Sequence, residues 1–219
     1  MERFKDPGLY RQGRTLFTRN LKPGVSVYEE ELVTVEGIEY RTFDPFRSKL
    51  AAYVAKGGRA WPFQHVGSLL YLGGGSGTTV SHVSDILPNS RIYAVERFPR
   101  PFGALLRLAE RRENVYPLLV DAQMPERYGA IPGEVDFLYQ DVSQRNQVEI
   151  LLDNVHALLN PHGWIMLQLK TRSITQKGSP QSIVRKAERM LEDAGLELIE
   201  EVDIAPFSRE HYTLLLRAE

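Results

Sequence analysis

The chain contains no cysteine, which excludes disulfide bonds, thiolate metal sites and a cysteine nucleophile. It has only five histidines, and these lack the spacing of metal ligands, so we expect no metal centre. No run of eighteen apolar residues occurs, and the N-terminus MERFKDPGLYRQ lacks the apolar core of a signal peptide. These absences predict a soluble, cytoplasmic protein that does not contact a membrane.

Net charge is also scarce, because 27 Lys and Arg nearly balance 28 Asp and Glu to give −1. The basic residues are nevertheless concentrated in segments 1–22, 91–112 and 170–190, each with six Lys or Arg and at most two acids. One basic face is enough for a polyanion, since each neutralised phosphate releases its counterions locally. The distribution is therefore compatible with RNA, whereas chance unevenness is the alternative for any single segment.

From about residue 68 the sequence alternates between short apolar runs and amphipathic segments. We expect strands at 68–72, 91–95, 115–120, 135–139 and 163–169, and helices at 78–87, 101–112, 147–159 and 180–193. Two late strands, about 197–204 and 211–217, are joined by too few residues for a crossover and should pair antiparallel. The pattern predicts an α/β fold, namely a Rossmann-like, doubly wound, mostly parallel seven-stranded sheet with a C-terminal antiparallel hairpin.

Residues 1–45 follow a different pattern. They contain β-like runs at 15–20, 25–35 and 38–43, separated by turn residues. Two or three such strands are marginal alone, so this small β-hairpin unit should pack on the main domain, residues 46–219.

A glycine-rich turn, Gly73 to Gly77, follows the first strand of the main domain and precedes a predicted helix. Glycine permits a sharp turn and close approach to a ligand, and a helix N-terminus attracts anions. A dinucleotide fingerprint would need glycine at position 78, and a Walker A loop would need a following lysine, so neither motif matches. Gly73, Gly75 and Gly77 instead suit a ligand with a carboxylate and no pyrophosphate; a tight turn without a ligand is the equal alternative.

Acidic residues end the next two predicted strands. Glu96 ends the second strand, where a carboxylate is suited to the two hydroxyls of an adenosine ribose, and Asp121-Ala122 follows the third, where it could take the adenine amino group. Asp141 follows the fourth strand and Lys170 the fifth, so adjacent strands would place these two side by side. Lys49 lies at the start of the main domain, before its first predicted strand, and alone would be interpreted as a solvated charge.

The sequence as a whole resembles the fibrillarin family, the RNA ribose methyltransferases of box C/D ribonucleoproteins, in its archaeal form. The matching segments are PFRSKLAA (45–52), LYLGGGSGTTVSHVSDI (70–86), YAVE (93–96), ERRENVYPLLVDA (110–122), QDVSQ (140–144) and LKTRSI (169–174). The resemblance implies transfer of a methyl group from S-adenosylmethionine to ribose 2′-hydroxyls of rRNA, with tRNA as a further substrate. It also implies that a guide RNA selects the target RNA, helped by a Nop-domain scaffold protein and a kink-turn-binding protein.

The resemblance further implies roles for individual residues. Those matching cofactor contacts are Thr78, Thr79, Glu96, Arg97, Asp121, Ala122, Asp141, Val142, Ser143 and Gln144. Those matching the family's catalytic set are Lys49, Asp141 and Lys170, with His211 as a fourth member. Arg97 departs from the family, which often has an aromatic residue there to pack on adenine.

These matches suggest a mechanism. A partly buried lysine beside a second cation gives up its proton more readily, so Lys170 could act as base or orient the attacking oxygen. Asp141 would hold Lys170, and Lys49 would anchor the adjacent phosphate. Three alternatives are a methyltransferase of this fold acting on a protein or small molecule, a non-catalytic adenosine-binding scaffold subunit, and a nicotinamide-dependent oxidoreductase. The two lysines disfavour the first two, and Thr78 disfavours the third.

Overall fold

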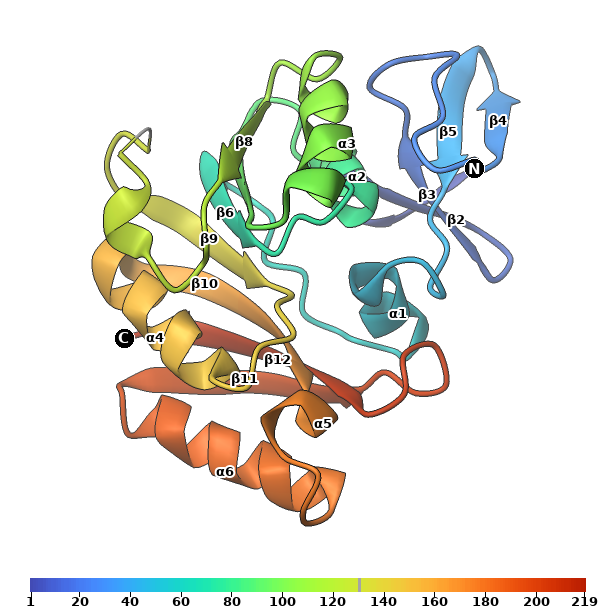
Figure 1. The fold of residues 1–219 in the computed structure, drawn as a ribbon. Helices are drawn as coiled ribbons and strands as arrows, with labels where there is room; N and C mark the ends of the chain where they lie inside the picture. Colours follow the sequence, from blue (N-terminus) through green and yellow to red (C-terminus); the bar gives the residue numbers. More distant parts are fainter. Residues whose placement is uncertain (130) are drawn as a thin grey trace.

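The computed structural model describes residues 1–129 and 131–219, and these contain a central seven-stranded sheet beside a smaller five-stranded one (Figure 1). The strands of the central sheet are β6 (Ser68–Leu72), β7 (Arg91–Glu96), β8 (Val115–Leu119), β9 (Val135–Gln140), β10 (Leu159–Lys170), β11 (Leu196–Asp203) and β12 (His211–Ala218). Their order is β11-β12-β10-β9-β6-β7-β8. Strands β6 to β10 run parallel, while β12 pairs antiparallel with both β10 and β11. The predicted mostly parallel sheet with a C-terminal hairpin is confirmed.

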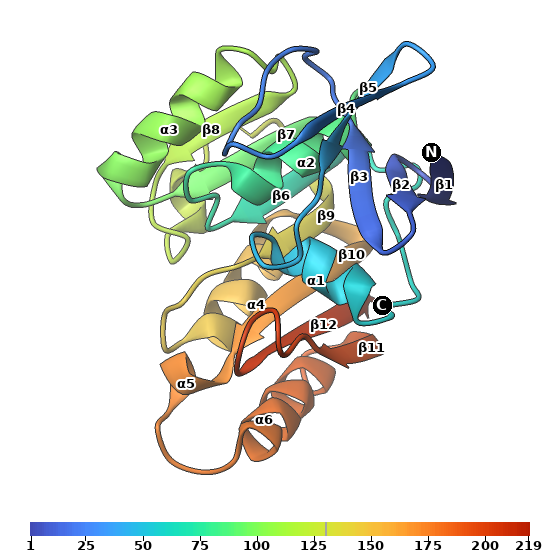
Figure 2. The same cartoon turned by 90° about the vertical axis from the view of Figure 1, so that its right-hand side faces the viewer.

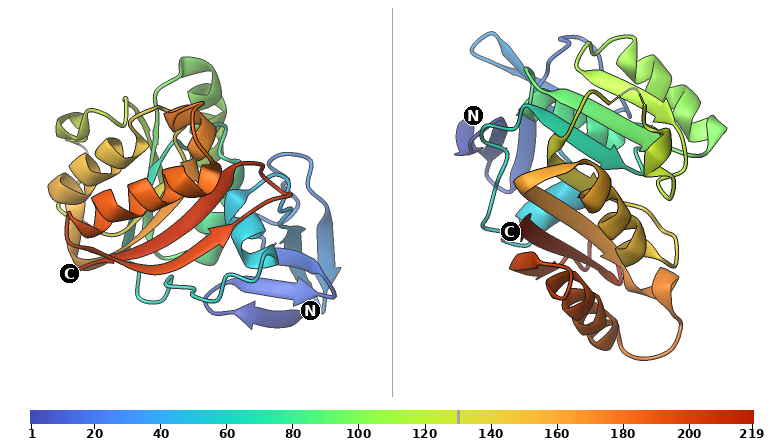
Figure 3. Two further views of the ribbon diagram at one scale, coloured as in Figure 1. Left: turned by 90° about the horizontal axis from the view of Figure 1, so that it is seen from below. Right: turned by 90° about the vertical axis from the view of Figure 1, so that its left-hand side faces the viewer.

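Helices cover both faces of the central sheet. They are α1 (Lys49–Ala55), α2 (Thr78–Ile86), α3 (Pro99–Ala109), the short 3-10 helix η1 (Pro125–Arg127), α4 (Gln147–Leu158), α5 (Thr171–Ile174) and α6 (Pro180–Glu192). Apolar side chains of α1, α2 and α3 share one buried cluster, and those of α4 and α6 share another. Figure 3 shows α4 and α6 on the face of the sheet opposite α1. Among the described residues, no helix is long and apolar enough to cross a membrane.

The N-terminal sheet is larger than predicted. It has the order β1-β2-β3-β5-β4, formed by β1 (Glu2–Lys5), β2 (Leu9–Gln12), β3 (Thr15–Arg19), β4 (Leu32–Val35) and β5 (Ile38–Thr42). The first hairpin was not predicted, because β1 and β2 are short and mostly polar. The prediction of a β-like run over 25–35 was wrong in its first half: the Glu30 carboxylate accepts the N–H groups of Val27 and Tyr28 and holds a bend there.

The N-terminal sheet packs on the main domain, as predicted. Leu9, Leu16 and Phe43 join the same buried cluster as Val83 and Ile86 of α2. Helix α1, which was not predicted, lies between the N-terminal sheet and strands β11 and β12 (Figure 2). The two sheets are therefore joined by one continuous apolar core.

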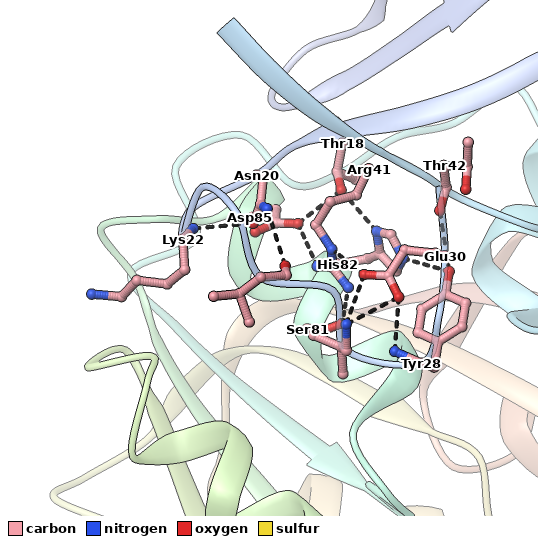
Figure 4. Close-up of polar contacts among 12 residues, drawn as sticks. Thr18, Asn20, Lys22, Tyr28, Glu30, Arg41, Thr42, Ser81, His82 and Asp85 are labelled. Carbon is pink, nitrogen blue, oxygen red and sulfur yellow. Dashed lines mark hydrogen bonds and ion pairs between the residues drawn. The ribbon is translucent and has the colours of Figure 1, made fainter. Parts of the chain in front are cut away.

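A buried ionic network also joins them (Figure 4). Arg41 of β5 donates to Glu30 at 2.6 Å and to Asp85 of α2 at 2.7 Å, and Arg112 donates to the other oxygen of Asp85 at 2.6 Å. Arg41 and Arg112 are 0% and 2% exposed, so their charges need these partners. Two cations and two carboxylates balance, which makes this buried cluster electrically neutral.

The order of the parallel strands reverses between β6 and β9, which are neighbours but not consecutive in the chain. In doubly wound sheets, such a switch point opens a crevice at the carboxyl ends of the strands. Gly73 follows β6 and Asp141 follows β9, so both predicted site segments lie at this crevice.

Candidate active site

A cavity of about 570 Å³ opens at the carboxyl ends of β6, β7 and β9. This volume lies within the range of small-molecule sites. The lining residues are Gly73, Gly75, Val95, Glu96, Arg97, Phe98, Pro101, Val120, Ala122, Asp141, Val142, Ser143, Gln144 and Arg145. We call it the main cavity. Nine predicted site residues therefore lie around one space.

Close packing around the turn after β6 requires glycine at two of its positions. Gly73 has φ +85°, and a Cβ there would collide with the carbonyl oxygen of Asp141. Gly77 has φ +94°, and a Cβ there would lie 2.6 Å from Leu108. At Gly75 the Cβ would meet nothing within 4 Å, so this glycine is the one that faces open space in the cavity wall. Gly73 thus allows the backbone of Asp141 to pass next to the turn.

Glu96 is 7% exposed and its carboxylate ties the turn to the next loop. One oxygen accepts the N–H of Gly75 at 2.9 Å, and the other accepts the N–H of Phe98 at 2.8 Å. A carboxylate oxygen can accept more than one hydrogen bond, so both Glu96 oxygens can still accept hydrogen bonds from the hydroxyl groups of a ligand in the main cavity.

Arg97 and Asp121 form a pair at the rim. The Arg97 guanidinium donates to Asp121 at 3.0 Å and lies 4.5 Å over the ring of Phe98. Hydrogen bonds to Asp121 from the Gln123 N–H and the Gln144 amide lower the pKa of its carboxyl, although partial burial alone would raise it. Sequence reasoning missed Phe98, which brings an aromatic ring into the wall one position after the expected one. The sequence did contain a signal for it, because an aromatic residue directly follows Arg97.

Lys49 and Asp141 form a bidentate contact at the edge of the cavity. The Lys49 Nζ donates to both oxygens of Asp141, at 2.7 and 2.6 Å, and the two side chains are 24% and 22% exposed. The prediction that Asp141 would hold Lys170 was therefore wrong, because α1 brings Lys49 to this carboxylate. Asp141 is fixed in turn by its N–H, which donates to Leu72 of β6 at 2.9 Å.

Two hydroxyls fix the helix that carries Lys49. Ser48 is the N-cap of α1, and its side chain accepts the N–H of Ala51. Thr79 of α2 donates to the Ser48 hydroxyl at 3.0 Å and is 9% exposed. Thr79, which was predicted to contact the cofactor, supports the start of α1 in the structure and does not line the main cavity. Ser48 was missed, although a serine immediately before a helix is a common N-cap signal.

Lys170 is positioned through its backbone. The amide side chain of Gln147, at the start of α4, accepts the Lys170 N–H at 2.9 Å and donates to the Lys170 carbonyl at 3.1 Å. Lys170 also lies opposite His211 in the register of β10 and β12. Gln147, which is 0% exposed, is a second supporting residue that the sequence pattern did not reveal.

The pKa of His211 is lowered, and the charges of the three other predicted catalytic residues contribute to the shift. Burial lowers the pKa of its imidazole, the Arg209 carbonyl raises it, and then Lys49 lowers it, Asp141 raises it and Lys170 lowers it. The Nδ1 atom lies 2.8 Å from the Arg209 carbonyl, a contact that requires a proton on Nδ1 and leaves Nε2 as the acceptor of the neutral ring. The four predicted catalytic residues thus converge.

Other predicted residues lie outside the main cavity. Gly77 packs on Leu108, Thr78 lines a separate cavity beside α3, and Asp121 borders a hollow on the far side of Arg97. Val142, Ser143 and Gln144 do line the main cavity, as Ala122 does.

A doubly wound sheet with a carboxylate-bordered cavity at its switch point defines the class of Rossmann-like nucleotide-binding α/β proteins. Within this class, residues 6–219 match the family model Fibrillarin. The chain belongs to the fibrillarin family.

Relatives match over nearly their whole length. A fibrillarin-like rRNA/tRNA 2′-O-methyltransferase of Methanosarcina acetivorans is 43% identical over 95% of this chain and 93% of its own. A solved structure of Aeropyrum pernix fibrillarin with natively bound S-adenosyl-L-methionine has a TM-score of 0.85 at 39% identity, covering 92% of this chain and 88% of that one. A solved fibrillarin/Nop5p complex has a TM-score of 0.89 at 35% identity, covering 97% and 98%.

Proposed function

We propose that the chain transfers a methyl group from S-adenosylmethionine to ribose 2′-hydroxyls of rRNA, and also of tRNA, at positions selected by a guide RNA. The observation that carries this proposal is the contact between Lys49 and Asp141 at the rim of a nucleoside-sized cavity, with Lys170 on the neighbouring strand. The names of the relatives and the cofactor bound to the Aeropyrum pernix structure support it.

The main cavity fits the methyl donor. Glu96 would accept the two ribose hydroxyls, because its oxygens retain accepting capacity. Phe98, Ala122 and Val142 offer apolar surface to the adenine ring. Ser143 and Gln144 line the same wall and offer polar groups to the rest of the molecule.

The bound donor supplies an electrophilic methyl group, so the protein's task is to present the ribose oxygen in line with it. Asp141 holds Lys49 and lines the main cavity, so it would place negative charge beside a cationic donor bound there. Lys170 orients the attacking hydroxyl or takes its proton, and the unprotonated Nε2 of His211 provides a second acceptor. Holding the reactants in line contributes several kcal/mol, up to about 7–11 in favourable cases.

An RNA acceptor accounts for the lysines better than a small molecule does, because a ribose beside a phosphate needs cations at the acceptor side. The partners follow from the relatives. The fibrillarin/Nop5p structure supports a Nop-domain scaffold protein as partner. A guide RNA and a kink-turn-binding protein complete the proposed assembly, since this chain displays no RNA-reading motif of its own.

The test is transfer of labelled methyl from the donor to guide-paired RNA, with both partner proteins supplied. Wild-type protein should label the RNA, and a 2′-deoxy residue at the paired position should abolish labelling. Labelling that persists on the deoxy substrate would place the methyl group on a base or on protein and would overturn the proposal.

A further inference from the structure

A second cavity, of about 280 Å³, lies between the β3–β4 loop and helices α2 and α3. Five basic side chains line it, and four of them, from three distant segments, form no ion pair among the described residues: Lys22, Arg47, Arg107 and Arg111. We call these four residues and the space between them the cationic pocket. Such a convergence is not a property of any one stretch of sequence, because the fold assembles it.

The charges of the cationic pocket are uncompensated. No aspartate or glutamate lines it, and among the residues that the structure describes none of its four cations has a carboxylate within 4.0 Å. Arg112 also touches this space, but it is neutralised by Asp85. Four unpaired cations around one hollow repel one another, and an anion would relieve that repulsion.

Hydroxyl and helix groups add to the attraction for an anion. Ser76 and Thr78 line the cationic pocket at the start of α2. Gly77, the N-cap, provides no side chain to cap the helix, so the partial positive charge of the α2 N-terminus is not offset there. Tyr28 and Arg47 form another wall, with the guanidinium 5.4 Å over the tyrosine ring.

The wall formed by the β3–β4 loop is held firmly. The Glu30 carboxylate accepts the backbone N–H of Tyr28 at 2.7 Å, and the Tyr28 hydroxyl lies 2.8 Å from Nε2 of the buried His82. Figure 4 shows Lys22 at the edge of this buried cluster, with its amino group directed away from it. The network thus preorganises the loop while leaving the charge of Lys22 free for a ligand.

The cationic pocket adjoins the candidate active site. Gly75 lines the main cavity and Ser76, the next residue, lines the cationic pocket. Arg47 lies two residues before Lys49. A chain of phosphates whose ribose reaches Lys49 and Asp141 would therefore continue past Arg47 into the cationic pocket.

We propose that the cationic pocket binds the phosphodiester backbone of the RNA that presents the acceptor ribose. This inference rests on the proposed function and assigns the RNA a path away from the methylated residue. The contacts are to phosphates, so they add affinity and register without reading sequence.

The test compares two pairs of arginines in the full-length chain. Arg107→Ala with Arg111→Ala removes two charges from the cationic pocket, and both side chains are exposed. Arg14→Ala with Arg217→Ala removes the same charge from the β2–β3 hairpin and from the end of β12, neither of which lines the cationic pocket. Binding of a labelled double-stranded RNA is measured over a range of salt concentrations, and donor affinity is measured on each preparation as a check of folding.

We expect the Arg107/Arg111 variant to bind RNA about tenfold more weakly or worse at low salt, and its salt slope to fall by about two. The Arg14/Arg217 variant should keep the wild-type slope, and all three proteins should bind the donor equally. Equal losses in both variants, or no loss in either, would overturn the assignment. Displacement of RNA by inorganic phosphate at an ionic strength where chloride has no effect would mark a small-anion site and would overturn it too.

Methyl transfer by the wild-type chain separates the two possible failures. If wild-type protein transfers no methyl group to guide-paired RNA, the proposed function fails whatever the slopes. If it transfers methyl while the slopes are unaltered, only the RNA path through the cationic pocket is wrong.

Discussion

At the scale of single residues, Lys49 and Asp141 are 92 positions apart in the sequence, yet their charged groups meet at 2.6 Å. Both side chains are about a quarter exposed, so solvent screens the pair and its effect on folding stability should be small. Its value is geometric, because it fixes a carboxylate and an ammonium group beside the cavity. Phe98 and His82 lead to two predictions at this scale.

Phe98 should matter for binding of the methyl donor. Phe98→Ala removes the aromatic wall of the main cavity, and loss of a stacking ring should weaken donor affinity by about tenfold, or ~1.4 kcal/mol. Isothermal calorimetry measures this directly. Leu106→Ala, which truncates an exposed apolar side chain of α3 outside that cavity, is the control and should bind as wild type does. Equal affinities for both variants would show that Phe98 does not contact the donor.

His82 should make the fold sensitive to mild acid. Burial, and then the charges of Arg41 and Arg112, hold its pKa well below the usual value of 6.5. The unfolded chain therefore binds a proton first, so the stability due to neutral His82 is complete above pH 6.5 and is lost as the pH falls below it. The free energy of unfolding in urea should fall by up to about 1.4 kcal/mol per pH unit in this window.

A His82→Asn variant isolates this effect. It should show a shallower decline, with the remainder due to His211, whose pKa is lowered as well. An identical pH profile for wild type and variant would mean that His82 is not the responsible group.

At the scale of elements, the site depends on α1 and on the turn after β6. Ser48 and Thr79 join α1 to α2, while Gly73 lets Asp141 approach the turn. These supports act only by placing Lys49 and Asp141 correctly, so changes in them should affect catalysis through geometry.

Gly73→Ala tests the turn. The new Cβ would collide with the Asp141 carbonyl, in addition to the strain of a positive φ, so methyl transfer should fall at least tenfold, or ~1.4 kcal/mol in barrier. Gly13→Ala carries a similar backbone strain of about 1–2 kcal/mol, at φ +59°, but its Cβ meets nothing within 4 Å. It should lose stability and keep its transfer rate. A Gly73→Ala protein that transfers methyl as fast as Gly13→Ala would show that the collision is relieved without moving Asp141.

Sequence periodicity predicted the elements whose apolar faces are regular. Strands β6 to β9 and helices α2, α4 and α6 match their predicted ranges to within one residue, whereas β10 begins four residues earlier than predicted and α3 lies two to three residues earlier. Helix α1 was missed because it is only seven residues long, and β1 and β2 because polar residues dominate them. In such short elements, tertiary contacts decide the structure and local pattern carries little information.

The candidate site could be predicted only as far as strand ends define it. Glu96, Asp141 and Lys170 each end or follow a strand, so topology alone brings them to one edge. Lys49 was placed by family resemblance, and its pairing with Asp141 depends on the packing of α1. The supporting residues Ser48 and Gln147 act through hydrogen bonds between distant segments, which no local pattern records.

At the scale of the whole molecule, a neutral ionic network and a shared apolar core hold the N-terminal sheet against α2. This attachment places the β3–β4 loop beside α3 and so builds the cationic pocket next to the glycine turn. The N-terminal sheet therefore contributes to the proposed function in two ways. It leads into α1, which carries Lys49, and its β3–β4 loop forms one wall of the proposed RNA path.

The most direct measurement is the single-turnover rate of methyl transfer to guide-paired RNA by wild type, Asp141→Ala and Lys170→Ala. Each variant should slow transfer at least tenfold, about 1.4 kcal/mol in barrier, because Asp141 holds Lys49 in place and Lys170 orients or deprotonates the ribose hydroxyl. Lys56→Ala, which changes an exposed lysine at the end of α1, should react at the wild-type rate. Wild-type rates for both Asp141→Ala and Lys170→Ala would contradict a methyl transfer centred on these strand ends.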